Sequence, residues 1–275
     1  MAGGIVSGDV VTVIQARTGS TRLPGKVLLP LGRSTVLERM LERVTAARLA
    51  GTVVVATTTE PADEEIVALA GRAGVPCFQG HPTDLLDRHY AVARALGARH
   101  VVKIPSDCPL IDPAVIDRVL SYYLAHAHAL DYVSNLHPAT YPDGFDVEVM
   151  GIDALATAWE EARRPFEREH TTPFLWTQPD RFRIGNVTWE TGEHCARSHR
   201  VVLDFVEDYE VIRRVDAALA DVRPRYTVRD IRRFLDLNPD VMALNDRHRG
   251  VSWYQHHLEE LPGLYGPAGA LAVAL

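Results

Sequence analysis

The 275-residue sequence has few cysteines, no long apolar run and no excess of basic residues. Its three cysteines, Cys77, Cys108 and Cys195, are odd in number and widely spaced, which argues against a disulfide framework and predicts reduced thiols. No apolar stretch approaches the roughly 20 residues of a membrane span, and the first residues lack the basic start and apolar core of a signal peptide. We therefore expect a cytoplasmic protein with no membrane partner.

Positive charge is also scarce. Acidic residues number 36 and basic residues 29, so the net charge of −7 offers no overall field that attracts nucleic acid or an anionic membrane. The hydrophobic fraction of 47% is ordinary for a globular protein, and a chain of 275 residues can bury a large core. Any binding site for an anion must therefore be local.

One candidate for such a site is the loop that follows the first apolar run. It contains Gly19, Gly25, Arg17, Arg22 and Lys26. A glycine-containing turn after a strand leaves backbone N–H groups unpaired, and the three cations can add positive charge around a bound phosphate. The P-loop pattern is missing, because Lys26 is followed by valine rather than by the serine or threonine that holds Mg²⁺. The loop therefore indicates a triphosphate site unlike that of P-loop kinases and ATPases, with an ordinary solvated turn as the alternative.

Apolar runs alternate with amphipathic segments over the first half of the chain. The pattern predicts strands at 10–16, 52–58, 76–79 and 100–104 and helices at 35–49, 64–73 and 84–96. Alternation of this kind implies a doubly wound, mostly parallel sheet that is covered by helices on both faces. We therefore expect an α/β fold.

In an open parallel sheet, ligands bind beyond the carboxyl ends of the strands. Asp107 follows the buried run 100–104 directly, and Asp204 lies near the end of another apolar run, 199–205, that we predict as a strand. Mg²⁺ is held by one or two carboxylates together with substrate phosphates, so this pair is the predicted metal site. Asp208, in the first turn of the next helix, is either an anchor or the alternate ligand. Each aspartate taken alone is equally well explained as a helix cap or a turn residue.

The stretch Ala16–Lys26 reads A-R-T-G-S-T-R-L-P-G-K. It resembles throughout the signature of the cytidylyltransferases that activate acidic sugars, the CMP-Kdo and CMP-acylneuraminate synthetases. The closest resemblance is to the branch named after spore-coat polysaccharide synthesis. The likeness extends over about residues 9–245 and implies a nucleotide-diphospho-sugar transferase fold of the GT-A-like kind. It also implies a homodimeric enzyme that uses CTP and Mg²⁺.

The resemblance also implies which residues act. The implied catalytic residues are Arg17, Arg22, Lys26 and Asp107, and the metal ligands are Asp107 and Asp204. The implied CTP-binding residues are Gln15, Ala16, Gly19, Ser20, Thr57, Thr58, Asp84, Asp87 and Arg88. For Asp84, Asp87 and Arg88, helix capping and a surface ion pair are an equally good explanation. The family string V-D-T-P-E-D is matched around Asp204 except that Phe205 and Val206 replace Thr-Pro.

The alternating pattern changes after residue 135. A Pro/Gly turn leads into a short strand at 146–149 and an amphipathic segment at 151–164. The family carries T-[FY]-P-x-G-x-D-x-E here, followed by E-R-E-H, and this chain has both. The implied acceptor-binding residues are Gly144, Asp146, Glu148, Arg168 and His170. An exposed charged helix turn is the plainer explanation of E-R-E-H.

The expected domain organisation follows from these segments. Residues 1–245 would form the nucleotidyltransferase domain, and residues 246–275 a C-terminal extension. By resemblance, residues 135–185 would be an inserted arm for acceptor binding and dimerisation.

The sequence as a whole predicts a CTP-dependent cytidylyltransferase that transfers CMP to an acidic sugar or a similar small acceptor and releases pyrophosphate. In that reaction an acceptor oxygen attacks the α-phosphorus, so catalysis consists mostly of positioning and of neutralising charge. Two alternatives stay open. One is a nucleotidyltransferase with another nucleotide or with a phosphate or phosphonate acceptor. The other is a nucleotide-sugar-binding or glycosyltransferase-like protein without cytidylyl transfer.

Overall fold

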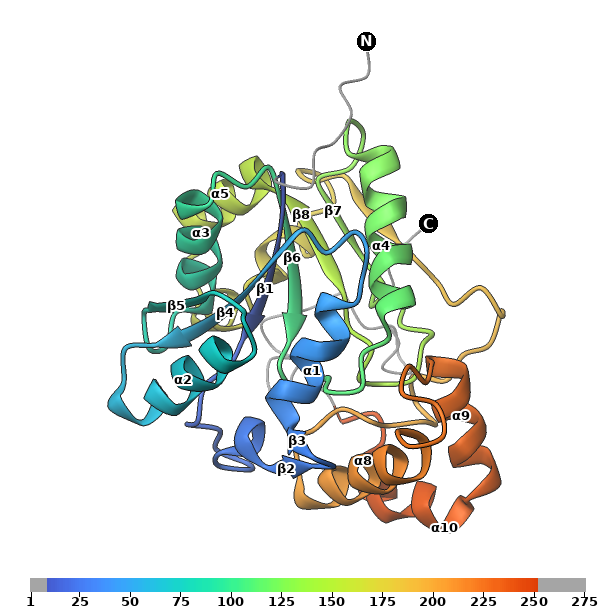
Figure 1. The fold of residues 1–275 in the computed structure, drawn as a ribbon. Coiled ribbons are helices and arrows are strands. Elements are labelled where there is room, and N and C mark those ends of the chain that lie inside the picture. The colour runs from blue at the N-terminus through green and yellow to red at the C-terminus, as the bar shows by residue number, and fades with distance from the viewer. Residues whose placement is uncertain (1–8, 252–275) are drawn as a thin grey trace.

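Within residues 9–251, which the computed structural model describes, a seven-stranded sheet forms the middle of the molecule (Figure 1). Its strands are β1 (Val10–Gln15), β4 (Thr52–Thr58), β5 (Cys77–Gly80), β6 (His100–Pro105), β7 (Tyr132–Ser134), β8 (Glu148–Gly151) and β9 (Ile184–Asn186). Their order across the sheet is β5-β4-β1-β6-β8-β7-β9. The short strands β2 (Pro30–Leu31) and β3 (Ser34–Thr35) pair with each other outside this sheet.

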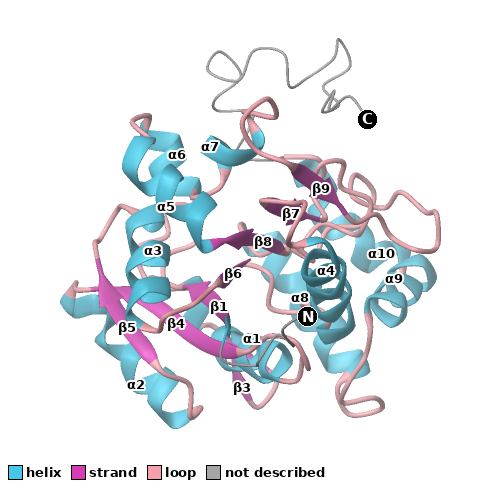
Figure 2. Cartoon of the chain, turned by 90° about the horizontal axis from the view of Figure 1, so that it is seen from above, coloured by secondary structure: helices cyan, strands magenta, loops and turns pink. Residues whose placement is uncertain are grey.

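Helices cover both faces of the sheet. They are α1 (Val36–Thr45), α2 (Glu64–Arg72), α3 (Leu85–Ala95), α4 (Pro113–His126), α5 (Ile152–Glu161), α6 (Pro165–His170), α7 (Pro173–Trp176), α8 (Val206–Leu219), α9 (Val228–Leu237) and α10 (Pro239–Met242). Seen from above, α3, α5 and α6 lie on one side of the sheet and α1, α4 and α8 on the other (Figure 2). Among the helices of residues 9–251, none has the length and apolar character needed to cross a lipid bilayer.

The strands β5, β4, β1 and β6 run parallel, whereas β8 runs antiparallel to both of its neighbours, β6 and β7. Successive side chains of a strand point to opposite faces, so an apolar run can fill two cores. In β1, Val10 and Ile14 belong to the core beneath α1 and α4, and Val11 and Val13 to the core beneath α3 and α5. The prediction of a doubly wound, mostly parallel sheet is confirmed.

Most predicted elements of the first half end within two residues of the observed ones, but the helix predicted at 35–49 ends at Thr45. Its start is fixed by a capping box in which Thr35 and Glu38 satisfy each other's backbone N–H groups. The residues after Thr45 leave the helical pattern, and the backbone N–H of Leu49 donates to the Asp117 carboxylate of α4 at 2.8 Å. Apolar spacing alone does not reveal such a bond.

The prediction of a strand at 199–205 is wrong. The segment is extended and buried, but within the described residues it joins no sheet, and Arg200 forms only an isolated bridge with Asp143. Its backbone bonds go to loops instead. Val201 donates to the Asp143 carbonyl at 2.8 Å, and Leu203 donates to the Asp107 carbonyl at 2.7 Å. The apolar pattern therefore identified a buried segment correctly and its pairing wrongly.

Residues 135–185, predicted as an inserted arm, contribute to the sheet itself. They contain β8, which lies between β6 and β7. They also contain the first two residues of β9, the edge strand beside β7. Their helices α5 and α6 pack against α3. The part that this segment plays in acceptor binding and in dimerisation stays a prediction.

We predict that Gly51→Ala destabilises the fold more than Gly74→Ala does. Both glycines have a left-handed φ, +61° for Gly51 and +69° for Gly74, so alanine is strained at either position. At Gly51 a Cβ atom would also lie 2.1 Å from the carbonyl oxygen of Val10, whereas none of the described atoms lies within 4 Å of a Cβ at Gly74. Denaturant unfolding should give a loss of about 1 kcal/mol for the Gly74 variant and at least about 2 kcal/mol for the Gly51 variant. Equal losses would contradict the steric part of this account.

Candidate active site

A cleft of about 730 Å³ opens beside the carboxyl ends of β1 and β6. Its walls include the loop after β1, the turn Pro105–Asp107 at the end of β6, residues from the stretch 135–148, and the extended segment that leads to Asp204. This is the edge at which ligands of open parallel sheets bind.

The structure brings many of the predicted site residues to this cleft. Those that line it are Gln15, Ala16, Arg17, Ser20, Arg22, Lys26, Arg88, Asp107, Asp146, Glu148, His170 and Asp204. Those that do not line it are Gly19, Thr57, Thr58, Asp84, Asp87, Gly144 and Arg168. The functional roles of both groups stay predictions, but the contacts described next separate groups that face a ligand from groups that hold the walls in place.

The loop after β1 is fixed by Asp63, a residue that the sequence analysis missed. The Asp63 carboxylate accepts hydrogen bonds from the Thr18 backbone N–H at 2.8 Å, from the Thr18 hydroxyl at 2.7 Å and from the Thr58 hydroxyl at 2.5 Å. Burial tends to raise the pKa of Asp63, but these hydrogen bonds outweigh it and lower that pKa below its usual value. Thr58 therefore contributes to the site through the loop anchor.

Gly25 turns the same loop toward the cleft. Its left-handed conformation, with φ 68°, precedes a 3₁₀ turn over Lys26–Leu28 and puts the lysine stem into the protein. The loop leaves Arg17 at the cleft without an ion-pair partner among the described residues, which distinguishes it from Arg22 and Lys26.

Lys26 brings the two candidate metal ligands together. Its Nζ lies 3.1 Å from Asp204 Oδ1 and 3.5 Å from Asp107 Oδ2, and it donates to the Leu203 carbonyl at 2.6 Å. Arg22 Nη2 adds a second bond to Asp204 Oδ1, at 2.7 Å. Burial raises the pKa of Asp204, but Lys26 and Arg22 outweigh it, so the pKa falls below its usual value and the carboxyl is ionised at neutral pH.

The donor set around Lys26 fits a hard cation. Asp107 and Asp204 supply carboxylate oxygens from two distant parts of the chain, and oxygen is the ligand that Mg²⁺ takes in proteins. Residues 9–251 contain no group of three or more His, Cys, Asp or Glu side chains arranged to hold a metal ion. A Mg²⁺ ion at this place would therefore need further oxygens from a substrate, as is usual for nucleotide sites.

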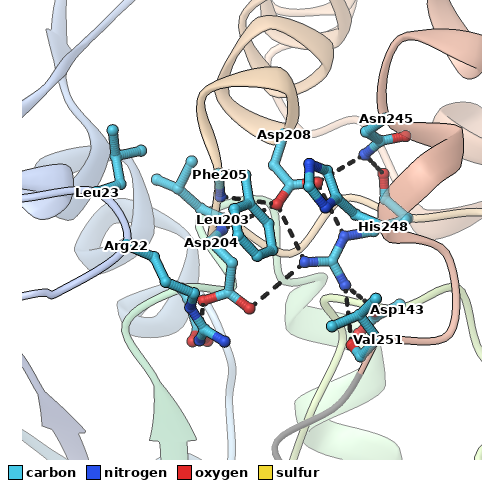
Figure 3. Close-up of polar contacts among 12 residues, drawn as sticks. Arg22, Leu23, Asp143, Leu203, Asp204, Phe205, Asp208, Asn245, His248 and Val251 are labelled. Carbon is cyan, nitrogen blue, oxygen red and sulfur yellow. Dashed lines mark hydrogen bonds and ion pairs between the residues drawn. The ribbon is translucent and has the colours of Figure 1, made fainter.

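Arg200 joins Asp204 to two further carboxylates, those of Asp143 and Asp208 (Figure 3). The Arg200 side chain is 1% exposed and donates to Asp208 Oδ1 at 2.8 Å, to Asp143 Oδ2 at 2.8 Å and to Asp204 Oδ2 at 3.4 Å. Burial opposes the charge of Arg200, but the three carboxylates outweigh it and raise its pKa. Arg200 thus fixes the orientation of Asp204.

Of the two roles predicted for Asp208, its contacts are those of an anchor. It is fully buried, and both of its oxygens are bonded to Arg200, at 2.8 and 3.0 Å. It also accepts hydrogen bonds from the backbone N–H groups of Asp204 and Phe205 and from the Asn245 amide. A carboxylate with these partners caps α8 and has no oxygen left for a metal ion.

Glu148 belongs to a second buried network, at the start of β8. It forms an ion pair with Lys103 and accepts hydrogen bonds from the Tyr132 hydroxyl at 2.5 Å and the Thr172 hydroxyl at 2.6 Å. Burial tends to raise the pKa of Glu148, but Lys103 and the hydroxyl donors outweigh it and lower that pKa below 4.5. Glu148 is therefore a charged residue of the cleft whose oxygens are bonded to other side chains of the protein.

Gly144 belongs to the motif that is predicted to bind the acceptor, and it allows close packing of two backbone segments. Gly144 has φ +110°, and a Cβ atom there would lie 2.7 Å from backbone atoms of Val201 and Val202. The glycine thus lets the loop before β8 lie against the extended segment that ends at Asp204. It shapes the cleft without lining it.

Two of the polar residues predicted around α3, Asp84 and Asp87, make their contacts within the protein and do not line the cleft. Asp84 caps the helix by accepting from the Asp87 backbone N–H at 2.8 Å, and it forms an ion pair with Arg168 at 2.6 Å. Asp87 accepts a hydrogen bond from Trp159 Nε1 at 2.8 Å. These contacts match the helix-cap and ion-pair explanation that the sequence left open. Arg88 differs, because it is buried, lines the cleft and donates to Gln15 Oε1 at 3.1 Å.

Several cleft residues were not predicted. The main ones are His89, Lys103, Tyr141, Asp143 and Arg200. Asp143 could have been found from its place in the Pro-Asp-Gly turn beside Gly144. His89 and Arg200 gave no signal, because a lone histidine in a helix and an arginine at the start of an apolar run are common in any fold.

Comparison with known proteins shows the family to which the chain belongs. The cytidylyltransferase family model matches residues 11–229. The spore coat polysaccharide biosynthesis protein SpsF of Bacillus subtilis is 29% identical over 239 residues, which cover 85% of this chain and 96% of that protein. A 3-deoxy-manno-octulosonate cytidylyltransferase of Geobacter sulfurreducens is 34% identical over 167 residues, 58% of this chain and 65% of that protein. The solved structure of a cytidylyltransferase from Leptospira borgpetersenii has a TM-score of 0.81 at 30% identity and covers 85% of this chain and 96% of its own.

We predict that Glu148→Gln lowers the free energy of unfolding at pH 7 and that the difference from the unchanged protein shrinks in acid. The folded pKa of Glu148 lies below its ordinary value of 4.5, so the charged form stabilises the fold above that pH. This contribution is lost as the pH falls through the folded pKa, because both states are then protonated. Denaturant unfolding at a series of pH values from 7 to about 3 measures the gap. A gap that stays constant over this range would show that the charge of Glu148 contributes nothing.

Proposed function

Since the chain is a nucleotidyltransferase of the cytidylyltransferase family, we propose that it uses CTP and Mg²⁺ to transfer CMP to an acidic sugar and releases pyrophosphate. The observation that carries this proposal is the meeting of Lys26, Asp107 and Asp204 at one point of the cleft. An ammonium group suits a phosphate, and two carboxylates suit a hard cation such as Mg²⁺, so the three side chains fit a phosphoryl-type transfer that needs both.

The loop after β1 would hold the triphosphate. Arg17 has no ion-pair partner among the described residues and lines the cleft, so it is ready for a phosphate oxygen. Arg22 and Lys26 would stabilise the charge that develops on the leaving pyrophosphate, at the cost of weakening their bonds to Asp204. Because transfer to phosphorus needs mainly positioning and neutralisation of charge, no covalent nucleophile is required.

Asp107 and Asp204 would hold the metal ion. When bound, Mg²⁺ would supply positive charge at the α-phosphate and a fixed point for the acceptor oxygen. Arg200 keeps Asp204 in place through its bond to Oδ2, so Oδ1 remains turned toward Lys26 and the cleft. The chain's own residues thus fix the direction in which the two carboxylates point.

An acidic acceptor is supported by charge at the other side of the cleft. Arg197 is exposed, lines the cleft and forms no ion pair with a described residue, so it can bind a carboxylate. Asp146 and His170 also line the cleft and can contact sugar hydroxyls. The relative from Geobacter sulfurreducens is named for 3-deoxy-manno-octulosonate, which makes that sugar acid the first acceptor to test. A homodimer, as expected from the resemblance, is part of the same proposal.

We predict that Asp107→Asn removes the dependence of CTP binding on Mg²⁺. Calorimetry of the unchanged protein should give at least about tenfold tighter CTP binding with Mg²⁺ than without it, and the variant should give nearly equal values. Asp240→Asn, a change on α10 outside the cleft, is the matched control and should behave as the unchanged protein. Thermal unfolding of both variants checks that the fold is intact. If the Asp107 variant kept the full Mg²⁺ effect, the metal assignment would be wrong.

The nucleotide and the acceptor can be tested separately. Calorimetry with CTP, UTP, ATP and GTP identifies the nucleotide, and pyrophosphate release with 3-deoxy-manno-octulosonate and other sugar acids identifies the acceptor. A preference for another nucleotide would favour the first alternative, a nucleotidyltransferase of different specificity. Selective CTP binding without pyrophosphate release for any acceptor would favour the second alternative, a protein without cytidylyl transfer.

A further inference from the structure

Two neighbouring residues of α3 have unsatisfied nitrogen atoms at the wall of the cleft. Nε and Nη1 of Arg88 and Nε2 of His89 are buried and find no hydrogen-bond partner among the described residues. Arg88 is 1% exposed and His89 is fully buried, and both line the cleft. Buried polar atoms are nearly always bonded, so three unsatisfied atoms on two adjacent residues need an explanation. An absent ligand supplies one.

The glutamine at the end of β1 determines what these atoms can do. Arg88 Nη2 contacts Gln15 Oε1 at 3.1 Å, and a guanidinium can only donate, so the glutamine oxygen is the acceptor there. The amide nitrogen of Gln15 therefore points the other way, toward His89 Nδ1 at 2.5 Å and the Leu85 carbonyl at 2.7 Å. The chain of contacts thus fixes the orientation of the amide.

The orientation of Gln15 in turn fixes the tautomer of His89. An amide nitrogen only donates, so His89 Nδ1 is the acceptor and Nε2 carries the proton. The Leu85 carbonyl, 2.9 Å from Nδ1, receives its hydrogen bond from Gln15. Burial lowers the pKa of His89 to about 3, so the ring is neutral at physiological pH and has one N–H group. That group is the unsatisfied Nε2.

Arg88 and His89 therefore have free donors and no free acceptor. The free groups are the Nε and Nη1 N–H groups of Arg88 and the Nε2 N–H of His89. Burial and the nearby charge of Arg17 lower the pKa of Arg88 to about 10, which still leaves the guanidinium charged at neutral pH. Gly80 makes room for the arginine, because a Cβ atom there would lie 2.9 Å from Arg88 Cγ. The position of Arg88 is thus built into the fold.

We propose that Arg88 and His89, oriented by Gln15, form a subsite for a ligand edge that has hydrogen-bond acceptors and no donor. The inference rests on the proposed function, which brings two such edges into the cleft. One is the O2/N3 edge of cytosine, and the other is the carboxylate of an acidic acceptor. Uracil is excluded, because its N3 carries a proton and would meet a donor. The same subsite therefore accounts for selection of CTP over UTP if the base occupies it.

The subsite can first be tested on the unchanged protein, without any question of folding. CTP and 3-deaza-CTP differ in that a C–H group replaces the N3 acceptor. If the base occupies the subsite, calorimetry should show 3-deaza-CTP and UTP binding on the order of 10- to 100-fold more weakly than CTP. If the carboxylate occupies it, CTP and 3-deaza-CTP should bind alike.

Variants then identify the residues. Arg88→Met and His89→Phe remove the donors, His89→Gln restores an N–H group near the Nε2 position, and Arg94→Met changes an exposed arginine of the same helix as the control. We expect the first two variants to lose about tenfold or more in affinity for one ligand and to bind inorganic tripolyphosphate normally. His89→Gln should recover part of the loss, and Arg94→Met should lose nothing. A loss confined to CTP assigns the subsite to the base, and a loss confined to 3-deoxy-manno-octulosonate assigns it to the carboxylate.

The outcomes separate this inference from the function on which it rests. If the unchanged protein bound none of the nucleotides, the proposed function would fail. If it bound CTP, and the Arg88 and His89 variants, folded by thermal unfolding, bound both CTP and the sugar acid as the unchanged protein does, only the subsite would be refuted. Should Arg88→Met or His89→Phe fail to fold, two measurements still test the subsite. One compares CTP, 3-deaza-CTP and UTP on the unchanged protein, and the other measures sugar-acid binding by His89→Gln.

Discussion

One buried positive charge, that of Arg200, holds the active-site end of the molecule together. It binds Asp143 from the loop before β8, Asp204 from the segment before α8 and Asp208 from α8 itself, and it also donates to the Val251 carbonyl at 3.3 Å. Three carboxylates around one buried cation would be costly if the cation were removed, because an unpaired buried charge destabilises a fold by several kcal/mol. The arrangement therefore couples the geometry of the cleft to the packing of the segments that enclose it.

The network also shows how the carboxylate of Asp204 can be held in place and still have an oxygen turned toward the cleft. Asp204 uses one oxygen for Arg200 and offers the other to Lys26 and Arg22. Asp208 receives the backbone N–H groups on either side, so the turn that carries Asp204 is fixed before any ligand arrives. Catalysis by positioning benefits from such preorganisation, because the groups need little rearrangement when charge develops.

Sequence reasoning located cleft residues that lie in a contiguous stretch and fell short where the cleft depends on contacts between distant segments. The loop from Gln15 to Lys26 was recognised because its residues lie side by side in the chain. Asp107 and Asp204 could be named because aspartates that follow apolar runs are visible without a structure, and the structure places both in the cleft beside Lys26. The pairing of 199–205 was wrong, because an apolar pattern reports burial and does not reveal whether a backbone bonds to a strand or to a loop. Asp63 and His89 were missed because they are identified by contacts with Thr18 and Gln15, and no sequence pattern connects residues so far apart.

The reversed direction of β8 has a consequence for how proteins with this architecture can diverge. Because β8 runs opposite to β6, its first residue, Glu148, pairs with Lys103, and the stretch that precedes the strand reaches the cleft. The loop proposed to hold the triphosphate follows β1, near the start of the chain, whereas the stretch before β8 comes more than a hundred residues later. Mutations in the later stretch can accumulate without disturbing the earlier one. If the two walls bind nucleotide and acceptor as proposed, the acceptor can change in the course of evolution while the nucleotide chemistry is inherited unchanged.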